Sequence, residues 1–176
     1  MTETPRLPAC AARDADGSGA EATSAELDRM TELALYRGAR FTAIGRGRSA
    51  EAARTAEGFA RRWEAAGRVV LDIVTWPEDA ASWLRQATRL AAADPDLWIM
   101  TGAPRGWAQM TRRLLWSTPW RPERTIASAA LGTERAIGLV GACNLEGLAG
   151  ATAVGGAWAI AGSRLTGAVD SPGAAG

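Results

Sequence analysis

The sequence contains no histidine and no lysine, and each absence narrows what the chain can do. Without histidine it lacks the commonest general base, the Ser-His and Cys-His pairs and the histidine-based metal sites. All twenty basic residues are arginine; in a chain so rich in Ala and Gly we attribute this to the codon bias of a GC-rich genome rather than to phosphate binding. We therefore expect no catalytic residue, no metal and no cofactor.

Cysteine and charge are also scarce. Cys10 and Cys143 are the only cysteines, too few for a zinc site or a disulfide framework. Cys10 ends Leu7-Pro8-Ala9-Cys10, which is similar to a lipoprotein cleavage box, but the apolar stretch that such a box requires is missing before it. The net charge is +1, and no apolar run approaches the roughly 20 residues of a membrane span. We expect neither a nucleic-acid partner nor a membrane span.

The length of 176 residues suits one domain with a sizeable core. Residues 1–23 combine Ala, Gly, Ser, Thr and acidic residues without an apolar period, which predicts a disordered tail. The Gly- and Ala-rich residues 166–176 predict a second disordered tail. The folded domain is therefore expected over 24–165.

Between the tails, apolar residues recur alternately with strand and helix periods. The pattern predicts a loop after every strand, and most helices are bounded by a capping residue, Gly or Pro. This alternation is typical of an α/β fold, a Rossmann-like parallel sheet flanked by helices. The predicted helices are 25–37, 50–66, 78–93, 104–116 and 134–141, and the predicted strands are 40–44, 69–74, 97–100 and 125–130, with two short ones near 150–154 and 156–161.

One motif lies where a parallel sheet binds ligands, at the carboxyl end of its first strand. The segment Gly45 to Ala50 reads G-x-G-x-x-A between a predicted strand and a predicted helix, the context of a dinucleotide fingerprint. Asp72 follows roughly where a ribose-binding carboxylate falls, and Arg46 and Arg48 are near enough to reach a phosphate. Asp72, however, lies inside its strand rather than at the end. A dinucleotide site and a plain tight turn both remain open.

Two further side chains are placed at the same edge. Trp76 follows the second strand and is a candidate pocket wall. Glu134 follows the fourth strand, where it either binds an amine or a sugar hydroxyl or stabilises a helix N-terminus by its charge. Of the other tryptophans, helical and strand spacing predicts core positions for Trp63, Trp83, Trp98 and Trp107, whereas Trp116 and Trp120 flank a turn and are candidates for a partner surface.

The order of these elements resembles one lobe of the type 1 periplasmic binding proteins, the branched-chain amino acid or amide receptors of ABC transporters. The resemblance covers about residues 27–162 and lies in the order of the segments rather than in one strict signature. The matching segments are a long Ala-rich helix ending in Gly, 49–67; a strand ending in a Trp-Pro step, 69–77; a helix closing on Pro-Asp, 84–96; the next strand, 97–102; the W-x-P-x-x-T step, 120–125; and an E-G-x-x-G segment, 145–152.

The resemblance implies solute capture without chemistry, by ligand residues that carry over only by position. These are Arg46, Gly47, Arg48, Ser49, Trp76, Gly102, Ala103, Gly132, Thr133 and Glu134. A working receptor closes two lobes on its ligand, whereas this chain has residues for one. The implied partners are a small molecule and either a second lobe, a second copy of the chain or a transporter permease. The family implies an extracytoplasmic location, but the chain taken as complete shows no signal peptide, which indicates the cytoplasm.

We therefore expect a non-catalytic module that binds or senses an amino-acid-like or amide ligand. Two alternatives use the segment Gly45 to Ser49 as an anion site. One is a sugar-phosphate binder, because this segment loosely resembles the entry of sugar isomerase domains, although the missing His and Lys weaken isomerase chemistry. The other is an NAD(P)-binding domain.

Overall fold

The computed structural model describes residues 20–167, and within them helices and strands alternate. The tails expected over 1–19 and 168–176 lie outside the described residues. The helices are α1 (Ser24–Tyr36), α2 (Ala50–Ala65), α3 (Leu84–Ala92), α4 (Pro104–Ser117) and α5 (Glu134–Val140). The strands are β1 (Phe41–Gly47), β2 (Val69–Trp76), β3 (Leu97–Thr101), β4 (Thr125–Ala127), β5 (Ala149–Ala151), β6 (Ala157–Ala161) and β7 (Arg164–Gly167).

The strands form one sheet in the order β2-β1-β3-β4-β5-β6-β7. The first five are parallel, as the βα alternation predicts, so the α/β fold is confirmed. The last two run antiparallel, so the sheet is mixed rather than wholly parallel. Strand β7 was not predicted, and it takes residues 166 and 167 out of the expected tail. Gly162 and Ser163, both at positive φ (57° and 60°), join β6 to β7 in a tight two-residue hairpin loop.

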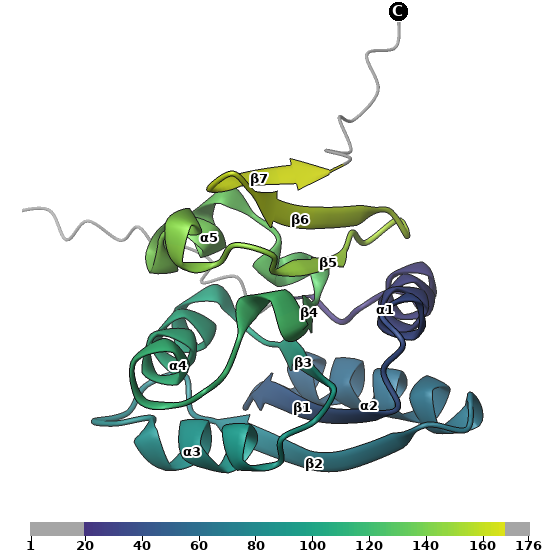
Figure 1. Ribbon diagram of the computed structural model, residues 1–176, viewed down its shortest axis with the longest axis horizontal. Helices are drawn as coiled ribbons and strands as arrows, with labels where there is room; N and C mark the ends of the chain where they lie inside the picture. Colours follow the sequence, from purple (N-terminus) through teal and green to yellow (C-terminus); the bar gives the residue numbers. More distant parts are fainter. Residues whose placement is uncertain (1–19, 168–176) are drawn as a thin grey trace, which may run out of the picture.

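Helices cover both faces of the sheet, as Figure 1 shows, with α1 and α2 on one face and α3, α4 and α5 on the other. Each face has its own apolar core. The central strand β3 supplies both, because Ile99 packs toward α1 and α2 while Trp98 and Met100 pack toward the opposite layer. All five residues of β3 are buried, as expected for a strand covered on both sides.

Helix ends follow the capping residues closely, with one correction at each of two helices. The α1 helix is capped by Thr23 rather than Ser24, since the Thr23 hydroxyl accepts the N–H of Glu26. Ser49 caps α2 as predicted, accepting the N–H of Ala52 at 3.2 Å. The helix predicted from residue 78 begins instead at Leu84. Residues 77–83 form an irregular crossing segment, because the Trp83 indole N–H donates to the carbonyl of Pro77 (2.9 Å) and ties its two ends together.

The described residues include no helix that is both long and apolar enough to cross a membrane.

Candidate functional site

The carboxyl ends of the five parallel strands define one edge of the sheet, which we call the carboxyl edge. The strand order reverses between β1 and β3, because β2 lies on one side of β1 and the later strands lie on the other. In open α/β sheets ligands bind outside the carboxyl ends of the strands at such a reversal. The carboxyl edge therefore has two parts: the reversal itself, at β1, β2 and β3, and the ends of β4 to β7.

At the reversal the backbone is packed too tightly for side chains. A Cβ on Gly102, which has φ of +146°, would lie 3.0 Å from the backbone nitrogen of Gly47 and 3.4 Å from the Trp76 ring. Deeper in the sheet, a Cβ on Gly45 would lie 2.7 Å from the same ring. Trp76 is fully buried and belongs to the core cluster beneath this edge. The strand thus extends through Trp76, so the expectation of a loop position for this residue is corrected.

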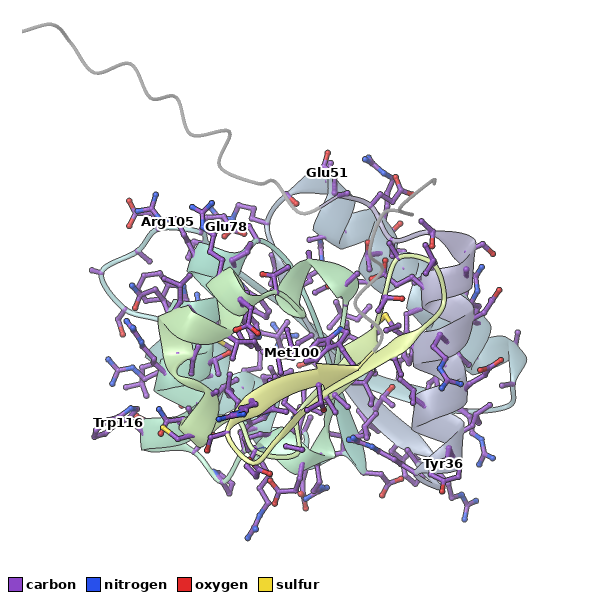
Figure 2. All side chains as sticks on the ribbon, turned by 90° about the horizontal axis from the view of Figure 1, so that it is seen from above. Tyr36, Glu51, Glu78, Met100, Arg105 and Trp116 are labelled. Atoms are coloured by element: carbon purple, nitrogen blue, oxygen red, sulfur yellow. The ribbon has the colours of Figure 1, made fainter. Side chains whose placement is uncertain are left out.

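Glu78 occupies the space above these glycines. Its two carboxylate oxygens would lie 2.4 Å and 2.1 Å from a Cβ placed on Gly47 and on Gly106 respectively, so only glycine fits at either position. Both oxygens are shielded from solvent and form no hydrogen bond of ordinary geometry. Burial raises the pKa of this carboxyl, and the nearby N–H groups of Gly106 and Arg48 only partly offset that effect. Figure 2 shows Glu78 and Arg105 at the same end of the molecule as Glu51.

The G-x-G-x-x-A motif is therefore a strand end and not a phosphate loop. Strand β1 runs through Gly47, and the two glycines make room for Trp76 and Glu78. A carboxylate already lies at the position where an anion would have to approach the N–H of Arg48. Asp72, the candidate ribose ligand, instead accepts two hydrogen bonds of 2.7 Å from the guanidinium of Arg89 on α3. Neither the dinucleotide nor the sugar-phosphate alternative is favoured by this arrangement.

The second part of the carboxyl edge is open, with a cavity of about 370 Å³ at the ends of β4, β5 and β7. Gly132, Thr133 and Glu134, all candidate ligand residues, lie along one side of it. The Thr133 hydroxyl is already engaged, since it accepts the N–H of Ala136 (3.1 Å) and caps α5. The remaining lining residues are Ala129, Thr152, Ala153, Trp158, Leu165, Thr166 and Gly167.

Trp158 on β6 fixes the shape of this cavity. Its indole is enclosed by two glycines, since a Cβ on Gly132 would lie 2.3 Å from the indole nitrogen and one on Gly150 would lie 2.5 Å from the ring. The indole N–H donates to the carbonyl of Ala151 at 3.1 Å, so the ring has one fixed orientation. The glycine-rich segment of the sequence is therefore needed to seat this tryptophan.

Helix α1 closes the back of the cavity through Glu26, which is 4 % exposed. One oxygen of Glu26 accepts the N–H of Ala129 at 2.7 Å, and the Thr23 hydroxyl donates to the carbonyl of Ala153. Both acceptor and donor backbone groups belong to cavity-lining residues. Burial raises the pKa of Glu26, although the N–H groups of Ala129 and Thr23 act in the opposite direction. The first turn of α1 thus holds two loops of the carboxyl edge in place.

The candidate residues fall into three groups. Gly47, Trp76 and Gly102 meet at the reversal, and Gly132, Thr133 and Glu134 meet at the cavity. The others occupy separate positions along the edge: Arg46 is half-buried within β1, Arg48 is exposed, Ser49 caps α2 and Ala103 precedes α4.

Sequence reasoning missed two side chains that shape this edge, Glu78 and Trp158. Glu78 follows Pro77 and had been interpreted as the first turn of a helix. Trp158 lies in the Gly-rich segment, where the pairing of several glycines with one tryptophan was the available signal. Within residues 20–167, no group of His, Cys, Asp and Glu is arranged to hold a metal ion.

No family model and no curated protein matches the chain. Solved structures do resemble it. One is a substrate-binding periplasmic protein from Ralstonia solanacearum, with TM-score 0.62 and 16 % identity over 74 % of this chain and 37 % of that one. Another is a putative branched-chain amino acid ABC transporter protein from Rhodospirillum rubrum, with TM-score 0.61 and 17 % identity over 72 % and 36 %. A third is an extracellular ligand-binding receptor from Rhodopseudomonas palustris, with TM-score 0.62 and 16 % identity over 72 % and 34 %.

The predicted resemblance is thus confirmed at the level of the fold: this chain has the α/β architecture of periplasmic and extracellular ligand-binding proteins. It spans little more than a third of the length of those proteins.

Proposed function

We propose that the chain is a non-catalytic module that binds a small solute at its carboxyl edge. The observation that carries this proposal is the cavity of about 370 Å³, which lies where α/β folds bind ligands. Its size is within the range of small-molecule sites, about 300–1,000 Å³. The fold likeness to ligand-binding receptors supports the same conclusion.

The ligand we favour is an amino-acid-like or amide compound. The cavity combines one carboxylate, Glu134, with threonine hydroxyls and the apolar surfaces of Trp158 and Leu165. Such a lining suits a molecule with a polar end and an apolar body, because each end finds a matching surface. One of the similar structures is described as a branched-chain amino acid transporter protein, which agrees with this class.

We further propose that binding is completed by a second body that covers the carboxyl edge. The similar proteins are about three times as long as their aligned part, so each has further chain with which to enclose a ligand. The candidates are a second lobe, a second copy of this chain or a transporter permease. An extracytoplasmic location follows from the same likeness and has the same standing.

The test is a thermal-shift screen followed by calorimetry, with L-leucine, acetamide, glucose 6-phosphate and NAD as probes. A ligand raises the unfolding temperature in a graded way as its concentration exceeds Kd. We expect a graded rise with L-leucine or acetamide. A response only to the two phosphorylated probes would refute the proposal and restore the anion-site alternative.

A pair of neighbouring variants locates the binding. Ala153 lines the cavity, whereas Val154 does not and is 66 % exposed. Ala153→Leu fills the cavity and should weaken binding at least tenfold, equivalent to about 1.4 kcal/mol. Val154→Leu adds one methylene next door and should leave binding unchanged. If both variants bind equally well, the ligand lies elsewhere.

A further inference from the structure

Glu78 is an unusual carboxylate for this chain, because other carboxylates that approach backbone amides are well satisfied. Asp96 accepts the N–H groups of Arg40 and Phe41 at 2.8 and 3.0 Å, and Glu146 accepts those of Gly162 and Ser163 at 2.9 and 3.0 Å. Both have lowered pKa values as a result. Glu78 has the opposite shift and no bond of ordinary geometry. It is therefore not a structural cap of the kind this fold uses elsewhere.

The cost of this arrangement is not compensated within the described residues. A carboxylate withdrawn from water without hydrogen bonds lowers the stability of the folded state. The glycines at positions 47 and 106 accept the group without supplying a side-chain donor. A buried polar group that stays unsatisfied requires a physical explanation, and a missing bound molecule is one.

A second unsatisfied group lies directly beneath. Trp76 is fully buried, and its indole N–H has no partner. The ring is oriented by its contacts: Cζ3 lies by Gly45, deep in β1, and Cζ2 lies by Gly102, at the carboxyl edge. Because Cζ2 is two bonds from the indole nitrogen, the edge of the ring that faces the strand ends is on the nitrogen side. The reversal thus holds an unpaired donor below an unpaired acceptor.

We propose that Glu78 is the group that recognises a cationic N–H donor, an ammonium or guanidinium, on the bound solute. In the free protein its carboxylate is folded between Gly47 and Gly106; rotation of its side chain brings the oxygens out to pair with the cation. The stem of Glu78 is partly exposed, which leaves it room to turn. This inference rests on the proposed function and adds the charge class of the ligand. A charge-assisted hydrogen bond is about twice as strong as a neutral one.

Two probes of equal length separate charge from shape. L-arginine carries a guanidinium where L-citrulline carries a neutral urea. Calorimetry on the whole chain should give L-arginine a roughly tenfold lower Kd than L-citrulline, the worth of one hydrogen bond to a charged group. Glu78→Gln should abolish this preference while retaining citrulline binding. Glu51→Gln, at the same end of the molecule (Figure 2), should leave the preference intact.

The outcomes distinguish this inference from the proposed function. If L-citrulline binds the wild type as tightly as L-arginine does, the role of Glu78 is overturned while solute binding at the carboxyl edge stands. If no amino acid or amide binds, both fail.

A ligand-free measurement guards against an artefact of folding. Because Glu78→Gln removes a buried charge, it should raise the unfolding temperature or leave it unchanged. A lower unfolding temperature together with an unchanged arginine preference would make Glu78 a structural residue and overturn the inference. Gly106→Ala should expel the carboxylate from its niche, and the carboxyl 13C titration of Glu78 should then move to lower pH. Gly138→Ala, whose Cβ meets nothing within 4 Å, should leave that titration unchanged.

Discussion

The two parts of the carboxyl edge use glycine and tryptophan in opposite ways. At the reversal, Gly45 and Gly102 let Trp76 fill all the space below the edge, and Glu78 fills the space above it. At the ends of β4 to β7, Gly132 and Gly150 seat the ring of Trp158, and a cavity remains beside it. The same residue types therefore produce a closed surface in one place and an open one in the other.

The difference teaches that a ligand site depends on which neighbours are left out. The closed part is rigid because backbone meets backbone there, but it leaves polar groups unsatisfied. The open part satisfies its polar groups locally, through the contacts of Glu26, Thr133 and the Trp158 indole. We expect the closed part to contribute more to stability and the open part to accommodate most of a ligand's volume.

The strongest way to break this comparison is to remove the floor of the closed part. Trp76→Ala deletes a fully buried indole and should lower the free energy of unfolding by about 3–5 kcal/mol. Trp116→Ala is the matched control, because that ring is 85 % exposed, and it should change stability by less than about 0.5 kcal/mol. Urea unfolding measures both. Equal effects would mean that Trp76 is not a core residue.

The open part is broken by crowding its tryptophan. A Cβ on Gly150 would lie 2.1 Å from the carbonyl oxygen of Ala127 and 2.5 Å from the Trp158 ring. Gly150→Ala should therefore cost about 3 kcal/mol, through overpacking of a buried strand. Gly138→Ala, at an open helical position, should instead gain up to about 1 kcal/mol. A tolerated Gly150→Ala would show that the strand shifts freely and that the ring is not fixed.

A smaller effect is expected where α1 supports the open part. Glu26→Ala removes the acceptor of the Ala129 N–H and should cost about 2 kcal/mol, because a buried donor loses its partner. Glu32→Ala removes an exposed ion pair with Arg29 on the same helix and should cost less than about 1 kcal/mol. Chemical denaturation gives both values. Similar losses in the two variants would argue against a supporting role for Glu26.

Acidification should sharpen the comparison least. Burial raises the pKa of Glu26, so the folded state holds this proton more tightly than the unfolded chain does. Relative to Glu26→Gln, the wild type should gain stability as pH falls from neutrality through the raised pKa, with the full gain present below the ordinary value of 4.5. Asp96, with its lowered pKa, contributes stability that is lost only below its ordinary value of 3.8. Urea unfolding at stepped pH tests this; a pH-independent difference contradicts it.

The alternation of elements was readable from the sequence because each parallel strand and its helix are specified locally. Apolar runs such as Leu97 to Met100 and caps such as Ser49 act within a few residues, and the structure places them as predicted. Trp63, Trp98 and Trp107 are buried as expected, whereas Trp83 is only partly buried. Trp120, a candidate for a partner surface, is 4 % exposed. Its burial depends on how the chain turns after α4, which no local pattern encodes.

The site was less predictable because its contacts join distant residues. Glu78 contacts Gly47 and Gly106, and Trp158 contacts Gly132. None of these pairs has a sequence spacing that betrays it. The G-x-G motif illustrates the difficulty, since the same glycines serve a phosphate loop or a strand end according to what packs on them. Strand β7 was missed for a related reason: its hairpin loop, Gly162-Ser163, reads as the beginning of a tail.

The free edge of the sheet carries one irregularity that bears on the behaviour of the protein in concentrated solution. The pairing of β1 with β2 slips between Thr42 and Ala43, leaving Leu71 as an extra, unpaired residue. Val69, Leu71 and Ile73 are all exposed on this border strand. A straight strand of that composition is a template for pairing with other chains and for aggregation. The bulge twists the border and spoils the template, so one surplus leucine helps to keep the molecules apart.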